Sequence, residues 1–403
     1  MTAGGFSTAR LARIGDAMAR HANVADGGTG VAGIVTMLYR HGDIAFADAR
    51  GYADAETRSP IARDSIFRIA SMTKPITTAA VLMLREEGRL QLHDPIEKWL
   101  PEFAAPRVLR AADGPIEDTV AAERPITVFD LLTHRAGLAY DFTAPPAMAA
   151  LYAQAFNGLH TRASSDECVR RLAGIPLLFQ PGSRWFYSVS IDLLGVIVAR
   201  IAGMTLGEFF RTRIFDPLGM RDTGFTLRED QASRMTSAYV YNDSTGNVLV
   251  ADKASETVWS HVGRFEGGGG GLISTADDYL QFGKLMLGRG RANGVRLLSH
   301  ASIDLMTSNV LSAEERATPT FGLDFWAGQT FGLGVSIVDD PIKRLPLGYR
   351  SAGAYSWGGA FGTNWIADPK EDMIGIFMIQ RRSESHYPVS AEFEQLAYAA
   401  IDD

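Results

Sequence analysis

Segments with the character of β-strands stand near both ends of this 403-residue chain, and a helix-rich stretch separates them. Apolar runs joined by short turns rich in Gly, Pro and Asp are typical of antiparallel hairpins. The strand-like segments are residues 31–40, 44–52, 331–338, 360–367 and 373–380. Because such a sheet must close across the middle of the chain, we expect a discontinuous α/β domain (residues 1–88 and 255–403) interrupted by a mainly helical domain (residues 89–254).

Helices are expected at both ends of the chain and throughout its middle. Leu11, Ile14 and Met18 share one face of an amphipathic N-terminal segment, Gly88 is a helix stop, and Thr205 opens a capping box. The expected helices cover residues 1–24, 71–87, 127–132 and 191–202, a segment from Thr205 to before Pro217, a segment capped by Ser274, and residues 390–401. Residues 107–123 are expected to form a long loop.

The charge pattern limits the possible partners. A formal charge of -7 with scattered basic residues argues against nucleic acid and against a membrane surface. No segment reaches the roughly 18 uninterrupted apolar residues of a membrane span, and residues 1–23 lack the apolar core of a secretory signal. We therefore expect a cytoplasmic protein. The single cysteine, Cys168, excludes an internal disulfide and is expected to be inert.

The segment Ser71-Met72-Thr73-Lys74 opens the strongest expected helix. Residues three apart share a helical face, so the serine hydroxyl and the lysine ammonium can meet. Unpaired N–H groups at a helix N-terminus favour a developing oxyanion, and a lysine in a dry site can accept a proton from serine. A single Ser-x-x-Lys match also arises by chance, so a capping Ser71 with a solvated Lys74 remains the alternative.

Other chemistries have weaker signals. The sequence contains no Gly-x-Ser-x-Gly elbow, no His-x-x-x-His pair and no Gly-x-Gly-x-x-Gly after a strand. Residues 267–271 are five consecutive glycines, but no Lys-Ser or Lys-Thr follows as a phosphate-binding loop requires. We interpret this run as a flexible turn or a close approach of backbone near a site. No metal or organic cofactor is predicted.

Three further segments accompany the Ser71 motif in a fixed order. The four runs are Phe67-Arg68-Ile69-Ala70-Ser71-Met72-Thr73-Lys74-Pro75, Leu131-Leu132-Thr133-His134-Arg135-Ala136-Gly137-Leu138, Pro181-Gly182 with Tyr187-Ser188 and Asp192-Leu193-Leu194-Gly195, and Trp357-Gly358-Gly359. Together they resemble the family VIII carboxylesterases, which share the class C β-lactamase fold, over about residues 30–380. The resemblance implies an α+β, serine β-lactamase-like fold, with an antiparallel sheet flanked by N- and C-terminal helices and a helical domain.

The resemblance also implies roles for individual residues. Tyr187 is expected beside Ser71 and Lys74, where a phenol that normally titrates near pH 10 can relay a proton because the lysine stabilises its anion. The oxyanion hole would consist of the backbone N–H groups of Ser71 and Ala360. His134 is expected to order a loop rather than to transfer protons.

Substrate contacts are expected from Trp357, Gly358, Gly359 and Val189, and the glycines let backbone approach the substrate. Where β-lactamases read Tyr-x-Asn, this chain has Tyr187-Ser188-Val189, and Trp357-Gly358-Gly359 replaces Lys-Thr-Gly. The amide and the cation that would bind a lactam are therefore missing, which favours neutral esters and leaves weak lactam turnover possible.

The sequence thus predicts a serine hydrolase that cleaves small carboxylic esters, with short to medium acyl groups, through an acyl-enzyme. The alternatives are an acyltransferase to a bulky alcohol, a β-lactamase, and a penicilloyl-binding sensor that acylates and stalls. The loops at residues 139–157 and 253–265 are expected to shape the pocket. The physiological substrate and the oligomeric state do not follow from the sequence.

Overall fold

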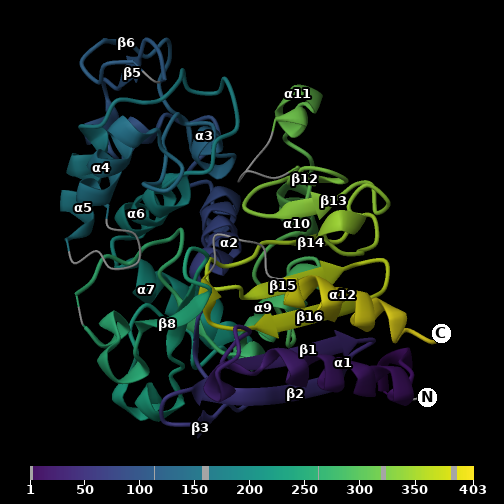
Figure 1. Cartoon of the computed structure of the whole chain (residues 1–403). Helices are drawn as coiled ribbons and strands as arrows, with labels where there is room; N and C mark the ends of the chain where they lie inside the picture. The colour runs from purple at the N-terminus through teal and green to yellow at the C-terminus, as the bar shows by residue number, and fades with distance from the viewer. Residues whose placement is uncertain (1–2, 113, 157–162, 262, 319–323, 383–387) are drawn as a thin grey trace.

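The computed structural model describes residues 3–112, 114–156, 163–261, 263–318, 324–382 and 388–403. Within these residues the largest sheet has eight strands, and each strand is antiparallel to its neighbours (Figure 1). In spatial order they are β12 (Gln329–Phe331), β13 (Ser336–Val338), β14 (Tyr355–Ser356), β15 (Asn364–Asp368), β16 (Met373–Met378), β1 (Gly33–Arg40), β2 (Asp43–Asp54) and β3 (Ser59–Pro60). Because β1 pairs with β16, the two ends of the chain meet inside one sheet, as predicted.

Helices cover the sheet and form a lobe beside it, where α3 to α6 gather (Figure 1). The α-helices of the described residues are α1 (Thr8–His21), α2 (Thr73–Glu86), α3 (Val128–Leu132), α4 (Pro146–Ala155), α5 (Ser165–Ala173), α6 (Ser190–Ala202), α7 (Leu206–Phe210), α8 (Asp216–Leu218), α9 (Ala276–Leu287), α10 (His300–Met306), α11 (Ala313–Ala317) and α12 (Val389–Ala399). The division into two domains at residues 88 and 255 stays a prediction.

Strand β1 illustrates how the sheet separates two apolar layers. Its side chains alternate, so Ile34 and Leu38 join the cluster formed with α1 and α12, while Val35 and Met37 join the larger core that includes α2 and α9. All four side chains are buried. A strand with apolar residues on both faces is a central strand, which explains why the sequence reads there as a continuous apolar run.

In the described part of the chain, four smaller sheets connect the remaining segments. They pair β4 (Phe67–Arg68) with β9 (Ile273–Ser274), β5 (Arg107–Leu109) with β6 (Thr119–Ala121), β10 (Arg291–Ala292) with β11 (Val295–Arg296), and β7 (Ala238–Asn242) with both β8 (Asn247–Asp252) and β17 (Arg381–Arg382). The β4–β9 pair matters most for function because β4 leads directly into the segment that carries Ser71.

Several expected segments have a different structure. Residues 331–338 are not one strand but the adjoining ends of β12 and β13, which pair across a turn where Gly334 has a φ of +72°. Residues 107–123 hold the β5–β6 hairpin instead of a long loop, and residues 360–363 form a turn before β15 begins. The segment 139–157, expected to be a loop, contains α4. Residue 157 of this segment and residue 262 of the segment 253–265 lie outside the described residues.

Two helix boundaries also differ from prediction. The helix from Thr205 continues past the expected end, because α7 runs into a π-helical turn, Arg211–Phe215, and then into α8. Pro217 is the second residue of α8 and follows the π-helical turn directly. Thr275, and not Ser274, caps α9 by accepting a hydrogen bond from the third residue of the helix, while Ser274 belongs to β9.

Of the helices described, none is by itself both long and apolar enough to cross a membrane. The segments Ser190–Ala202 and Leu206–Leu218 reach that length and composition only as a pair, bent by 79°.

Candidate active site

Ser71 lies in a tight turn at the N-terminal end of α2. A 3₁₀ turn, Ala70–Met72, precedes the helix, and Ala70 adopts a φ of +42°, which is uncommon for a residue with a side chain. The Tyr279 hydroxyl, from α9, donates to the Met72 carbonyl at 2.8 Å and fixes the far side of the turn. The turn therefore presents Ser71 from a backbone that is held on both sides.

The structure brings Ser71, Lys74 and Tyr187 together. Lys74 Nζ donates to Ser71 Oγ at 3.1 Å, and the Tyr187 hydroxyl donates to the same oxygen at 2.7 Å. Lys74 is only 1% exposed and Tyr187 only 7%. A hydroxyl with two proton-carrying neighbours in a dry site has the geometry required of an activated nucleophile.

Lys74 is held from the opposite side by a backbone carbonyl and two rings. Its Nζ donates to the Gly269 carbonyl at 2.6 Å and lies 4.6 Å from the ring centroid of Tyr187 and 5.2 Å from that of Tyr140. Gly269 belongs to the run of five glycines, so the close backbone approach expected there takes place at the nucleophile's partner. A cation facing two aromatic rings is stabilised by their quadrupoles.

Asp192 is a charged residue of this site that the sequence analysis did not single out. Its carboxylate is buried, accepts the Gly269 N–H at 2.8 Å, and accepts the Tyr140 hydroxyl at 2.9 Å. Burial raises the pKa of the Asp192 carboxyl, while Lys74 and these two donors act against that rise. Burial and the Asp192 charge raise the pKa of Tyr140 well above its ordinary value, so Tyr140 stays a donor.

The loop after β14 carries the Trp-Gly-Gly segment and Ala360. Gly359 approaches the nucleophile turn so closely that a Cβ there would lie 2.4 Å from the Ile69 carbonyl oxygen. The Thr363 hydroxyl also donates to that oxygen, at 3.3 Å. The backbone N–H of Ala360 makes no hydrogen bond with any residue that the structure describes. This N–H therefore stays available beside the turn that carries Ser71.

The other expected substrate contacts differ in exposure. The Trp357 indole N–H donates to the Tyr187 hydroxyl at 3.4 Å, and the indole is buried. Gly358 is exposed, and a Cβ there would make only ordinary contacts. Val189 is fully buried at the start of α6 and is not among the described residues that line the cleft.

His134 is fully buried against Tyr187, with ring centroids 4.9 Å apart. Its Nδ1 accepts the backbone N–H of Ser188 at 3.2 Å. Burial, helped by the charge of Lys74, places the pKa of His134 well below its ordinary value, so the imidazole is neutral. A neutral ring bonded to the backbone next to Tyr187 fits an ordering role.

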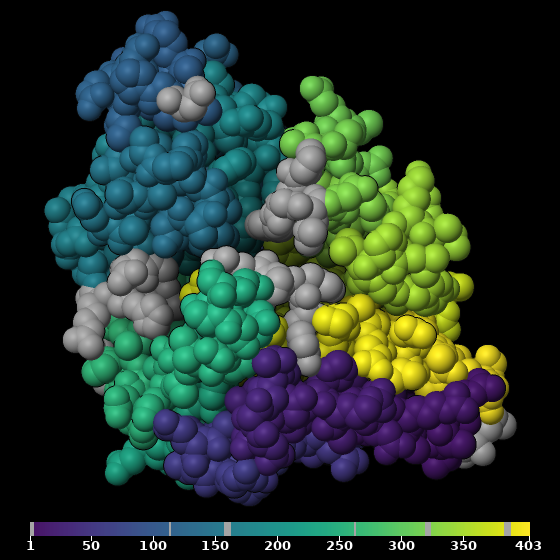
Figure 2. All heavy atoms as spheres, viewed as in Figure 1, coloured from purple at the N-terminus to yellow at the C-terminus, as the bar shows by residue number. Residues whose placement is uncertain are grey.

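A cleft of about 1580 Å³ lies between the helical lobe and the segment that includes α11, where Figure 2 shows a hollow between the blue-teal and green atoms. Of the site residues only Tyr187 is among the described residues that line it; Ser71, Lys74 and the Trp357-Gly358-Gly359 segment are not. Tyr187 lines it together with aromatic and charged side chains, among them Phe142, Phe186, Arg184 and Glu314. Phe142 is 65% exposed, which is unusual for a phenylalanine. An apolar ring at the mouth of a cleft is suited to contact with a substrate.

The described residues include no group of three or more His, Cys, Asp or Glu side chains placed to hold a metal ion. Burial raises the pKa of the Cys168 thiol to about 11, which keeps it protonated and unreactive.

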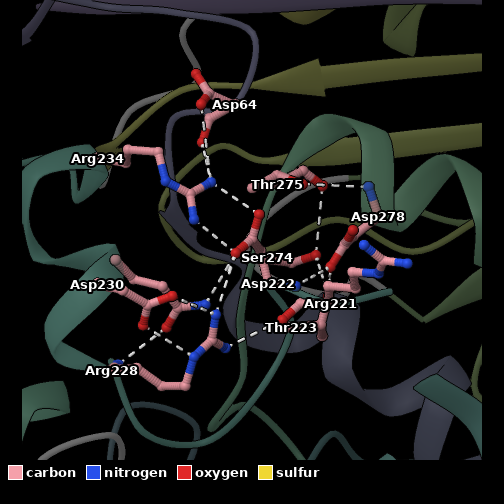
Figure 3. A network of polar contacts seen from close by, with 11 residues as sticks. Asp64, Arg221, Asp222, Thr223, Arg228, Asp230, Arg234, Ser274, Thr275 and Asp278 are labelled. Carbon is pink, nitrogen blue, oxygen red and sulfur yellow. Dashed lines mark hydrogen bonds and ion pairs between the residues drawn. The ribbon is translucent and has the colours of Figure 1, made fainter. Parts of the chain in front are cut away.

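A separate polar network surrounds the N-terminal end of α9 (Figure 3). Asp222 pairs with Arg234 through two hydrogen bonds of 2.6 and 2.7 Å. Asp278 accepts the Asp222 N–H at 2.7 Å and the Thr223 hydroxyl at 2.8 Å, both on one oxygen. Burial raises the pKa of Asp278 to about 6, whereas Arg234 lowers that of Asp222 to about 2. The network joins α9 to the segment that contacts β9, and β9 pairs with the strand before Ser71.

The antiparallel sheet with its terminal helices, the helical lobe and the Ser-Lys-Tyr cluster at a helix N-terminus define a serine β-lactamase-like protein. A family model described as Beta-lactamase matches residues 18–399, and the chain belongs to that family.

Relatives within the family are known as esterases. Esterase EstB of Burkholderia gladioli is 33% identical to this chain, and the match covers 83% of the chain and 82% of EstB. The lovastatin esterase of Penicillium rubens is 32% identical, with 80% and 81% covered. The solved structure of EstCE1, a hydrolase with promiscuous acyltransferase activity, superposes with a TM-score of 0.79 at 26% identity, covering 98% of this chain and 99% of EstCE1. The predicted family resemblance and the predicted α+β fold are confirmed.

Proposed function

We propose that this protein is a serine carboxylesterase that cleaves small-molecule esters through an acyl-enzyme formed on Ser71. The observation that carries the proposal is the position of Ser71 Oγ, 3.1 Å from Lys74 Nζ and 2.7 Å from the Tyr187 hydroxyl, at a helix N-terminus. Relatives named as esterases support the same activity. A cytoplasmic location remains part of the proposal and rests on the sequence.

The reaction has two halves that use the same groups. Ser71 Oγ attacks the ester carbonyl while its proton passes to the Lys74–Tyr187 pair, and Tyr187 returns a proton to the departing alcohol. Water then attacks the acyl-serine, and the same relay takes a proton from the water and returns one to Ser71. No cofactor enters either half.

The tetrahedral oxyanion is stabilised by the backbone N–H groups of Ser71 and Ala360. The N–H of Ala360, which bonds to none of the described residues, and the packing of Gly359 against the Ile69 carbonyl support this arrangement. The buried indole of Trp357 orients Tyr187 through its N–H and forms part of the wall of the site.

The substrate is a neutral ester with a short to medium acyl group. Lactams are poorer substrates, because Val189 and the Trp357-Gly358-Gly359 segment supply neither an amide nor a cation for a lactam carboxylate. The likeness to EstCE1, a hydrolase with promiscuous acyltransferase activity, also supports a second activity, transfer of the acyl group to a bulky alcohol. A rise in ester product over acid product when such an alcohol is added would measure that transfer.

The test is hydrolysis of p-nitrophenyl acetate, butyrate and octanoate, with nitrocefin in parallel, by wild type and Ser71→Ala. We expect ester turnover to fall at least 10³-fold in Ser71→Ala, because the nucleophile is removed. Ser244→Ala, at an exposed turn serine, is the matched control and should keep full activity. Turnover that survives Ser71→Ala would exclude Ser71 as nucleophile, and nitrocefin cleavage faster than ester cleavage would make the protein a β-lactamase.

A further inference from the structure

A buried carboxylate is linked to the nucleophile through the backbone of one glycine. We propose that Asp192 is a positioning residue that holds Lys74 in place as an ammonium ion and thereby sets the pH at which Ser71 becomes reactive. The inference rests on the proposed function of the Ser71 site and goes beyond it, since it concerns a side chain that touches neither Ser71 nor the cleft lining.

The geometric link consists of three successive hydrogen bonds. Asp192 accepts the Gly269 N–H at 2.8 Å, the Gly269 carbonyl accepts Lys74 Nζ at 2.6 Å, and Lys74 donates to Ser71 at 3.1 Å. A Cβ at position 269 would lie 2.2 Å from Asp192 Oδ2, so only glycine fits between the carboxylate and the lysine. Movement of Asp192 would therefore shift the carbonyl that anchors Lys74.

The surroundings of Asp192 indicate that it is ionised. An ionised carboxylate only accepts hydrogen bonds, and both neighbours, the Gly269 N–H and the Tyr140 hydroxyl, are donors. The Tyr140 ring contacts the ammonium as well, at 5.2 Å from Lys74 Nζ. One carboxylate and one cation thus share a dry compartment closed by Tyr140, and each charge compensates the burial of the other.

Three other buried titratable groups near this pair are neutral. His134 is neutral because burial lowers its pKa, whereas the Tyr140 hydroxyl and the Cys168 thiol keep their protons because burial raises theirs. Tyr187 takes part in the reaction itself. Asp192 is the buried carboxylate whose pKa the charge of Lys74 lowers, whereas Asp141, whose charge also raises the pKa of Tyr140, is partly exposed.

The charge of Asp192 has a direct consequence for the reaction. The reactive state forms when the Lys74–Tyr187 pair loses one proton, and a neighbouring negative charge opposes that loss. With Lys74 kept as an ammonium, Tyr187 is the group that gives up its proton and then accepts the one from Ser71 Oγ as the Oγ–acyl bond forms. The tyrosine passes that proton to the alcohol oxygen when the ester C–O bond breaks.

The variant Asp192→Asn separates charge from shape. The asparagine oxygen can still accept the Gly269 N–H, and its NH₂ group can donate to the Tyr140 oxygen. We expect the acidic limb of kcat/KM for p-nitrophenyl butyrate to move about one pH unit lower, because removal of a facing charge eases proton loss. The plateau rate should fall roughly tenfold, since a less charged Lys74 stabilises the phenolate less.

Asp278→Asn is the matched control, because Asp278 is a second buried carboxyl whose hydrogen-bond partners are Thr223 and Asp222. The acidic limb of kcat/KM for Asp278→Asn should coincide with that of wild type. If the Asp192→Asn variant folds and the acidic limb of its kcat/KM coincides with that of wild type, the proposal is overturned.

Two further readouts keep the inference testable if a variant is unstable or if the chain does not turn over esters. The rate at which a fluorophosphonate labels Ser71, followed by mass spectrometry, should show the same one-unit shift in Asp192→Asn. If wild type hydrolyses no ester but the labelling rate still shows this shift, the result would count against the proposed esterase function and not against the role of Asp192. In wild type, ¹³C NMR of the six lysines should show a charged Lys74 at pH 8, and a neutral Lys74 at that pH would refute the role of Asp192.

Discussion

The Asp278 carboxyl allows a quantitative test of the polar network at the N-terminal end of α9. Its pKa is raised from 3.8 to about 6 by burial, so the folded protein binds this proton more tightly than the unfolded chain does. The contribution of Asp278 to the free energy of unfolding is therefore most favourable below about pH 4. It falls as the pH rises to about 6 and is constant above that pH. At pH 7 and above, the buried charge costs about 3 kcal/mol relative to the protonated form.

The substitution Asp278→Asn removes this cost while keeping the hydrogen bonds. Both donors, the Asp222 N–H and the Thr223 hydroxyl, bond to one oxygen of Asp278, so the single oxygen of asparagine can accept both. We expect the gain in unfolding free energy of the variant over wild type to be about 2 kcal/mol larger at pH 8 than at pH 4.5. A uniform loss caused by imperfect packing would displace both values equally and leave this difference intact.

Urea unfolding followed by tryptophan fluorescence at a series of pH values measures the effect. Asp277→Asn is the control, because Asp277 is the neighbouring residue on α9 but lies at the surface, paired with Arg63. Asp277→Asn should show no gain in unfolding free energy over wild type at high pH. Parallel stability curves for wild type and Asp278→Asn would refute the reasoning, since they would mean that Asp278 titrates alike in the folded and unfolded chains.

Three further predictions concern the active site and the same network. Tyr187→Phe should lower kcat for p-nitrophenyl butyrate by 10²- to 10⁴-fold and leave thermal unfolding unchanged, and a smaller loss would argue against a proton relay. Trp357→Phe should keep the packing but lose the N–H to Tyr187, reducing kcat about tenfold with little change in KM; a change in KM alone would point to a substrate contact. Asp222→Asn should cost about 2 kcal/mol at pH 7, because Arg234 holds the Asp222 pKa near 2. That cost should vanish as the pH falls through about 2, and a loss independent of pH in urea unfolding would contradict it.

Local patterns in the sequence predicted the elements that depend on neighbouring residues. The hairpin β1–β2 and the turn between β15 and β16 follow from apolar runs bounded by turn residues, and Gly88 ends the helix that follows Ser71 with a φ of +71°. The errors arose where a short feature interrupted a regular pattern. Gly334 turns the chain inside an apolar run, and a π-helical turn carries the helix from Thr205 past its expected end.

The candidate site could be predicted only as far as its motifs reach. Ser71, Lys74, Tyr187 and Asp192 all lie in recognisable segments, but the proposed role of Asp192 depends on a hydrogen bond to a residue 77 positions away. Its second partner, Tyr140, is 52 positions away. No pattern within one segment encodes such a pairing, because it arises only when α6 and the glycine run pack together. The burial of Val189 follows from the same packing and likewise could not be predicted from the sequence.

The glycine run at residues 267–271 has a consequence for how this gene tolerates mutation. At three of its positions a methyl group would lie less than 3 Å from a neighbour: Asp192 and Tyr140 at Gly269, the Ile191 carbonyl at Gly268, and Phe225 at Gly271. A library of random variants should therefore lose function here as abruptly as at Ser71, although these residues carry no side chain. A segment whose sequence resembles a flexible linker would therefore be, in such a screen, one of the parts of the protein that tolerate substitution least.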